Sequence, residues 1–557
     1  MKNKTNSLKI PVQAMNTFNK KILSIHTQAK YINNQMQRLA KKLGCYFKYF
    51  KMVRPVLLIY ISFMILALLW RPAYGGQSKS AFGANDRLQV SSVLQSHMVV
   101  QQNKPFKIWG QGPVGAKVTI RADWMATSIQ VFCDTRGKFE GIIPVPVAKK
   151  GDYSPHRIVL KSGEQQVQLK DLLIGDVWFL SGQSNMQFAV REMLDSSKII
   201  AGANPKIRLL NVALNFSASP IDSITGTWTL CTPSSVRDFS AVGYCFGNKL
   251  QHELDIPVGL IFSGIGASAV QAYVPEEVLQ KDSMLNRVYL SPYLQSPKSK
   301  EKIDAGFSFE KVTRPFLLYN ALIHPFIRLS IKGICWYQGE TNYKDRGSFT
   351  RATIALIKSW RKRFQQGALP FNFVQIAPFA HDKMDPTLAG DAFFREAQQR
   401  VLQLNNTNMA VTMDVGNPQN LHPKDKKPVG DRLAAIALNR TYGRLEQPYL
   451  GPKFDYVRFV GDSAIVHFLS STVGGGLTTN NGKAPAFFFV AGSDRVFHPA
   501  TAIIRGNTVA VFTSRVPRPV AVRYAFFNYP VTNLQNGAGF PALPFRTDHW
   551  PEKPENY

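Results

Sequence analysis

The hydrophobic pattern of the chain changes twice, and these changes divide it into three folded parts. Between about Leu88 and Leu173, short alternating apolar runs are separated by turns such as GQGPVG and TRGKFEG, which predicts an antiparallel β-sandwich. From Asp176 to about Tyr442, strand-like runs alternate with helical patterns, which predicts right-handed βαβ units around a parallel sheet. Strand-like runs return between about Tyr449 and Phe527 and predict a second β module.

Five runs in the middle part have the length and composition of buried strands. They are Val177 to Leu180, Val258 to Phe262, Ile331 to Tyr337, Phe371 to Ile376 and Ala410 to Met413. Helical faces lie between them, for example Ala352, Leu356, Trp360 and Phe364, spaced four apart, and a closing helix that ends near Gly443. We therefore expect an α/β domain over 175–445, a β-sandwich-like domain over 87–174 and a C-terminal β domain over 446–557.

Residues 1–76 carry a basic leader followed by an apolar run. Val56 to Trp70 is fifteen uncharged apolar residues followed by small residues, and this length suits a secretory signal peptide better than a bilayer span of about twenty residues. We expect export to the periplasm or the extracellular space, with a membrane anchor by an uncleaved 56–70 as the alternative. A basic region of this length is abnormal before a signal sequence, so we expect translation to start at Met52.

The net charge of +31 is concentrated near the amino terminus. Residues 1–52 hold eleven Lys or Arg and no acid, and Arg54 and Arg71 add two more, so 31 − 13 leaves +18 for the rest. This remainder is spread along the chain with no basic helix that is interleaved with aromatic residues, so we expect no nucleic-acid partner. A basic surface of this kind favours anionic ligands modestly.

The four cysteines after the leader are Cys133, Cys231, Cys245 and Cys335. None has CxxC or His-paired spacing, which argues against a zinc site. Export permits a disulfide, and Cys231 with Cys245 is the nearest pair. Free buried thiols are the open alternative.

The stretch DVWFLSGQSNMQFAV, at 176–190, carries the first candidate for chemistry. Its apolar run stops abruptly before Ser184, which places that hydroxyl at the exit of a strand, where open α/β sheets bind ligands. A helix that starts at Asn185 would direct its free N–H groups to the same point. A plain turn is the alternative.

A serine near neutral pH needs a base to accept its proton. His422 lies in the polar loop NPQNLHPKD, between a predicted strand and the last helix, at the same edge of the sheet as Ser184. We expect it to be the base, with a surface-loop histidine as the alternative.

Two further loops at this edge offer donors for an oxyanion. Gln338 follows the strand Ile331 to Tyr337, and Gly266 lies in SGIGAS after another strand, although a turn glycine is an equal alternative there. A carboxylate beside an oxyanion would repel its charge, so we expect Glu340 to have a supporting role.

Three motifs in order resemble the sialate O-acetylesterase branch of the SGNH or GDSL hydrolases. They are GQSNM at 182–186, WYQGETN at 336–342 and LHP at 421–423, with LYNALIHPF at 318–326 and REAQ at 395–398 in support. The resemblance covers the chain from about residue 87. It implies a three-layer α/β/α hydrolase domain with accompanying β domains, export, no metal or other cofactor, and removal of acetyl groups from sialic acid hydroxyls.

The resemblance also implies roles for individual residues. The family's nucleophile falls on Ser184 and its base on His422, while its oxyanion donors fall on the Ser184 backbone, Gly266 and Gln338. Glu340 and Asn342, in the same motif as Gln338, are expected to support the site from behind.

The chain departs from the family at the third member of the triad. The family has an aspartate two residues before the histidine, and this chain has Asn420. Asparagine cannot supply a full charge to an imidazolium, and such a change in a serine triad costs on the order of ten-thousand-fold in turnover. Either the enzyme is slow, or Asp414 or Asp425 substitutes. Ala267, where the family has a second glycine, is a milder change.

We therefore expect an exported serine esterase that forms an acetyl-serine and acts on sialic acids or related acetylated sugars. The alternatives are a weakened relative that binds acylated glycans, or an esterase for acetylated xylan. The expected partner is an acetylated sugar, with no stable membrane span after signal cleavage. The motifs contain the residues expected to act on the ester group, and they do not identify the sugar that carries it.

Overall fold

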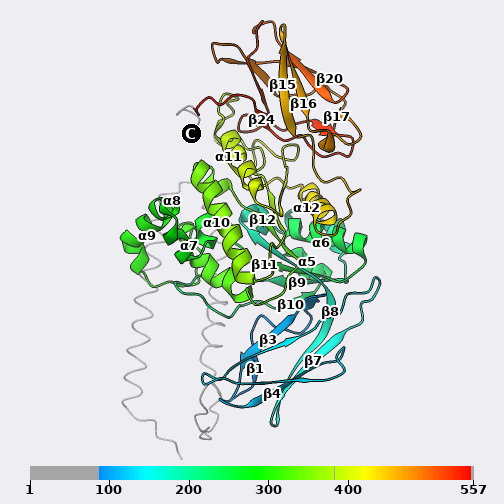
Figure 1. Ribbon diagram of the computed structural model, residues 1–557, viewed down its shortest axis with the longest axis vertical. Helices are drawn as coiled ribbons and strands as arrows, with labels where there is room; N and C mark the ends of the chain where they lie inside the picture. Colours follow the sequence, from blue (N-terminus) through cyan, green and yellow to red (C-terminus); the bar gives the residue numbers. More distant parts are fainter. Residues whose placement is uncertain (1–86, 382, 553–557) are drawn as a thin grey trace, which may run out of the picture. The chain divides into compact units, whose positions relative to one another are not determined.

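A single long strand, β8 (Gln165–Gly182), connects the N-terminal strands to the central sheet, as Figure 1 shows. Its first half pairs antiparallel with β7 (His156–Ser162). Its second half lies between two parallel neighbours, β11 (Val258–Phe262) and β12 (Gly333–Tyr337). The strand predicted at Val177 to Leu180 is thus the end of a much longer one, which continues through the boundary predicted between residues 174 and 175.

The computed structural model describes residues 87–381 and 383–552. The predicted signal peptide, the expected start at Met52 and the alternative anchor at 56–70 lie outside these residues. Within the described ranges, no helix combines the length and apolar character needed to cross a bilayer.

The N-terminal part consists of short paired strands, in agreement with its alternating pattern. Most pairs are antiparallel, and among the strands of this part that the structure describes only β2 runs parallel to its partner, β8. The strands before β7 are β1 (Gln89–Val90), β2 (Val99–Gln101), β3 (Phe106–Gln111), β4 (Lys117–Ala122), β5 (Ile129–Phe132) and β6 (Lys138–Ile143).

The central sheet has the order β10-β9-β11-β8-β12-β13-β14. Its strands are parallel except β10, which pairs antiparallel with β9 at one edge. The fifth predicted strand lies at Thr407–Ala410 and not at 410–413, because the pairing between β13 and β14 ends at Ala410. The mixed α/β fold class is confirmed. The other strands of this sheet are β9 (Ile207–Asn211), β10 (Trp228–Leu230) and β13 (Phe371–Val374).

Helices cover both faces of this sheet (Figure 1). On one face, α6 (Ala241–Leu254) and α12 (Lys427–Arg440) pack on the cluster that contains Trp178 and Leu180. On the other, α10 (Arg346–Phe364) and α11 (Gly390–Gln399) contribute to the cluster that contains Phe179. Successive side chains of β8 therefore enter opposite cores, as the pleat of a strand requires.

The shorter helices connect these elements. They are α3 (Ser184–Gln187), α4 (Ser196–Ala201), α5 (Pro233–Arg237), α7 (Glu276–Lys281), α8 (Ser283–Leu285) and α9 (Ser291–Gln295).

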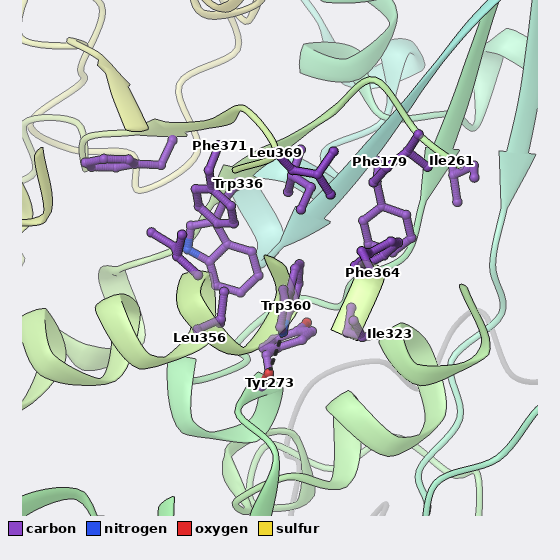
Figure 2. Packing of buried hydrophobic residues seen from close by; sticks show 14 of the residues in the cluster. Phe179, Ile261, Tyr273, Ile323, Trp336, Leu356, Trp360, Phe364, Leu369 and Phe371 are labelled. Atoms are coloured by element: carbon purple, nitrogen blue, oxygen red, sulfur yellow. Dashed lines mark hydrogen bonds between the residues drawn. The ribbon is translucent and has the colours of Figure 1, made fainter. Parts of the chain in front are cut away.

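The core beside α10 is built from aromatic side chains, which Figure 2 shows from close by. The ring of Trp360 lies edge-on to those of Phe179 and Trp336, with centroid separations of 6.2 and 5.8 Å. Its indole N–H donates to the backbone carbonyl of Tyr273 at 3.0 Å. The helical face predicted from the four-residue spacing is the buried face of α10.

The C-terminal part is again all β within the described residues. Its contact with the α/β part includes Arg395 of α11, a buried guanidinium that donates to the carbonyls of Phe527 and Asn528. The strands are β15 (Phe454–Val460), β16 (Ser463–Phe468), β17 (Leu477–Thr479), β18 (Phe488–Ala491), β19 (Phe497–Pro499), β20 (Thr501–Arg505), β21 (Thr508–Phe512), β22 (Ala521–Tyr524), β23 (Leu534–Asn536) and β24 (Phe545–Arg546).

The structure decides between a disulfide and free thiols for the cysteines after the leader. Cys133, Cys231, Cys245 and Cys335 are all buried free thiols. The pair Cys231 and Cys245 forms no disulfide, and burial raises the pKa of each thiol, which keeps both protonated.

Replacing Trp360 tests this core. Trp360→Ala removes a fully buried ring and a hydrogen-bond donor, so we expect a loss of about 3–5 kcal/mol in the free energy of unfolding. Trp360→Phe keeps most of the ring and should cost less. Urea unfolding followed by circular dichroism measures both, and equal losses for the two variants would contradict this account.

Candidate active site

The turn that carries Ser184 is fixed by close packing of two strands. Gly182, the last residue of β8, has a φ of +137°, and a Cβ there would come within 2.1 Å of the carbonyl oxygen of Tyr337 in β12. Only glycine fits this approach. The helix predicted from Asn185 begins at Ser184 and has only four residues. Ser184 therefore stands at the carboxyl edge of the sheet, as predicted.

His422 reaches the same point from the far end of the α/β part. It lies in the loop between β14 and α12, and its Nε2 is 2.8 Å from the Oγ of Ser184, a residue 238 positions earlier. Burial and the nearby ammonium of Lys426 lower the pKa of His422. The imidazole is therefore neutral at pH 7 and has the form that can accept a proton.

The third position of the expected triad is arranged differently. The side-chain oxygen of Asn420 accepts from the backbone N–H of His422 at 2.9 Å. Asp414 accepts two hydrogen bonds from Arg432, at 2.7 and 2.6 Å, and Asp425 lines a separate cavity of about 480 Å³. Within the described ranges, neither aspartate forms a hydrogen bond or ion pair with His422.

A buried polar network lies behind Ser184 and His422. The side-chain amide of Asn185 donates to Glu340 Oε1 at 2.6 Å and to the backbone carbonyl of Leu421 at 3.1 Å. Its oxygen accepts from Lys426 Nζ at 2.5 Å. Asn185 follows the serine and Leu421 precedes the histidine, so one carboxamide fixes both loops relative to each other.

The charges of this network are shifted by burial. Burial lowers the pKa of Lys426 to about 7, and burial raises the pKa of Glu340. The Lys426 ammonium also lies 4.8 Å from the centre of the Phe188 ring. Glu340 contacts Asn185 in this network, and its supporting role stays a prediction. Lys426 was not singled out by sequence, because three lysines follow His422 within five residues and nothing in the pattern shows which one is buried.

The expected oxyanion donors have other partners in the structure. The N–H of Gly266 donates to Gln187 Oε1 at 2.8 Å, and a Cβ on Gly266 would lie 3.4 Å from that of Ser184. The buried amide of Gln338 donates to the carbonyl of Ser268 at 3.1 Å and to Asn342 Oδ1 at 2.7 Å. Gly266 is thus beside the serine, while Asn342 holds Gln338. Their donor roles stay predictions.

Two cavities meet at the serine and the histidine. The smaller, about 270 Å³, is lined by both residues together with Arg191, Glu192 and Asp238. Arg191 is paired with Asp238, and the charge of Glu192 partly offsets the lowering of the His422 pKa. The larger cavity, about 430 Å³, is lined by both residues and by several aromatic side chains. Ser184 is therefore open to a ligand from two sides.

Replacing Lys426 tests the charge of the buried network. The folded pKa is about 7 and the ordinary value is 10.5, so between these values the unfolded chain binds a proton that the folded protein lacks. The wild type therefore gains stability as pH rises through this window, whereas Lys426→Met has no such term. We expect the free energy of unfolding of the variant to exceed that of the wild type most below pH 7. Above pH 7 this excess should fall by about 1.4 kcal/mol per pH unit.

Urea unfolding at several pH values measures this difference. Lys427→Met is the matched control, because hydrogen bonding to Asp431 raises the pKa of Lys427 and leaves it protonated across the window. Parallel stability curves for wild type and Lys426→Met would show that Lys426 is not a buried, weakly basic amine.

The chain is similar to known carbohydrate esterases in sequence and in fold. The family model for carbohydrate esterases described as sialic acid-specific acetylesterases matches residues 305–439. Sialate O-acetylesterase of Mus musculus is 25% identical over 511 residues, covering 82% of this chain and 94% of that protein, and the Rattus norvegicus protein is 27% identical over 414 residues, covering 66% and 76%. The crystal structure of a carbohydrate acetylesterase from Xanthomonas citri superposes with a TM-score of 0.74 at 32% identity, covering 83% of this chain and all of that one. The chain is a carboxylic ester hydrolase and belongs to the sialate O-acetylesterase family.

Proposed function

We propose that this protein is an exported serine esterase that removes O-acetyl groups from sialic acids or related acetylated sugars. The observation that carries the proposal is the 2.8 Å hydrogen bond between Ser184 Oγ and His422 Nε2. A neutral imidazole in contact with a serine hydroxyl at the edge of a sheet is the arrangement that activates a serine for acyl transfer. The apolar run at 56–70 supports the export part of the proposal.

The first half of the proposed reaction forms an acetyl-serine. His422 accepts the proton of Ser184 as the serine oxygen attacks the acetyl carbonyl. The imidazolium then gives this proton to the sugar oxygen as the ester bond breaks, and the sugar leaves with its hydroxyl restored. In the second half, His422 takes a proton from water as the water oxygen attacks the acetyl carbonyl. The imidazolium then returns this proton to Ser184 Oγ as the bond between the acetyl carbon and Oγ breaks, and acetate leaves.

The oxyanion of each tetrahedral intermediate needs donors beside Ser184. We assign this role to the backbone N–H groups of Ser184 and Gly266, with the Gln338 amide as a third donor. The proximity of Gly266 to Ser184 supports this assignment. In the free enzyme Gln187 occupies the N–H of Gly266, so its side chain must turn away when substrate binds.

Asn420 favours a slow version of this reaction. Its oxygen contacts the backbone of His422, and a neutral carboxamide adds no charge to stabilise an imidazolium. The buried Lys426 lowers the pKa of His422 further. Binding of acylated glycans with weak or no hydrolysis is therefore the second candidate function.

Ser184→Ala tests the proposal directly. We expect the purified protein to hydrolyse 4-nitrophenyl acetate and the variant to lose on the order of 10³-fold or more in kcat, because the nucleophile is gone. Rapid quenching followed by mass spectrometry should find an acetyl group on Ser184 in the wild type. Ser493→Ala, at an exposed serine in the C-terminal part, is the control. Hydrolysis that survives Ser184→Ala would refute the assignment.

Asn420→Asp tests the cause of a slow turnover. The aspartate keeps an oxygen for the backbone N–H of His422 and adds a charge beside the imidazole, so we expect kcat to rise on the order of tenfold at neutral pH. Asn417→Asp puts the same charge at an exposed position of the same loop and should give no gain. No gain with Asn420→Asp would indicate that another acid, such as Glu192, already stabilises the imidazolium.

A further inference from the structure

The larger cavity beside Ser184 has aromatic residues from two separate parts of the chain. Phe307 and Phe309 come from the lysine-rich segment after α9, and their rings lie edge to face with centroids 5.1 Å apart. Tyr343 and Phe379 belong to the second group, and both contact the ring of His381, at centroid distances of 4.8 and 4.9 Å. Ring faces and edges therefore line a space into which the nucleophile opens.

The first aromatic pair is unusually exposed for its type. Phe309 is 74% exposed and Phe307 is 49% exposed. Two neighbouring phenylalanines in water forgo stabilisation from burial, and such apolar patches beside a reactive group mark ligand sites. Phe307 and Phe309 line the same cavity as Ser184 and His422, which indicates that they contact a part of the substrate.

The charges that line this cavity bear on the choice between an anionic and a neutral acetylated sugar. Among the described residues that line it, the charged side chains are the acids Glu340 and Asp391, with no lysine or arginine. Lys344 lies 5.4 Å from the centre of the Tyr343 ring but is not a lining residue. A sugar carboxylate placed here would lose water without gaining a cationic partner, which is costly.

Together, these observations identify the occupant by its chemistry. A neutral pyranose has an apolar face of C–H groups that packs on an aromatic ring, and its hydroxyls exchange hydrogen bonds with polar side chains of the lining such as Thr341. We propose that this cavity is the sugar subsite of the esterase proposed above, and that it takes a neutral acetylated pyranose stacked on Phe307 and Phe309.

This inference rests on the proposed function but differs from it in what it predicts. The double variant Phe307→Ala, Phe309→Ala removes the exposed rings and leaves Ser184 and His422 in place. We expect KM for acetylated xylo-oligosaccharides to rise on the order of tenfold, a loss equivalent to about 1.4 kcal/mol of binding. Hydrolysis of methyl acetate, whose small alcohol cannot stack on the two rings, should change by less than about twofold.

Phe132→Ala is the matched control. This phenylalanine of β5 is also exposed but lies in the N-terminal strands, away from the cavity residues, so its removal should alter neither substrate. Acetate release from O-acetylated sialic acid by the wild type is the competing measurement. We expect a lower kcat/KM for it than for the neutral oligosaccharides, and no effect of Lys344→Met.

Two outcomes would overturn the inference and leave the esterase intact. One is an unchanged KM for the xylo-oligosaccharides in the double variant. The other is a preference for sialic acid that Lys344→Met abolishes. If the wild type shows no Ser184-dependent hydrolysis at all, the proposed function fails, and calorimetric binding of unacetylated xylo-oligosaccharides to wild type and double variant still decides the subsite.

Discussion

The hydrogen bond between Ser184 and His422 depends on the register between β8 and β12. Tyr337 is paired with Gly182 at the ends of these two strands, and the glycine allows their backbones to approach closely enough for the chain to turn into the serine. The serine thereby faces the loop after β14, whose position follows from its own pairing with β13. A shift of one residue in β8 would move every side chain of the strand to the opposite face and displace Ser184.

Behind this contact, the protein uses a buried amine and a carboxamide to hold two distant loops together. The side-chain amide of Asn185 connects the serine turn to Leu421, and Lys426 donates a hydrogen bond to the side-chain oxygen of Asn185. Burial of an ammonium is unfavourable, which is why the pKa of Lys426 falls to about 7. The lowered pKa of His422 is partly a consequence of this neighbour. Rigidity of the site and basicity of its histidine are therefore coupled through one lysine.

In the proposed function, the two sides of the site act on different parts of a substrate. Ser184, His422 and the Asn185 network would act on the ester, and the aromatic cavity would bind the group that carries it. The basic character of the sequence favours anionic ligands in general, but the charged residues lining this cavity are acidic. Net charge acts through the long-range field, while selectivity depends on the few groups that contact the ligand after water has left.

The sequence alone determined the alternation of strands and helices in the α/β part and the motifs at three strand ends, because periodicity and turn residues act over short distances. It did not predict β9 and β10 of the central sheet. It located Ser184 and His422 at one edge of the sheet and left open whether they touch. Only the tertiary structure decided that they do, that β8 runs from residue 165, that Asp414 pairs with Arg432, and that Lys426 is buried. The partners of Gln338 and the exposure of Phe307 and Phe309 likewise depend on residues far along the chain. Local patterns cannot specify such contacts, because burial and pairing are set by segments that meet only when the chain has folded.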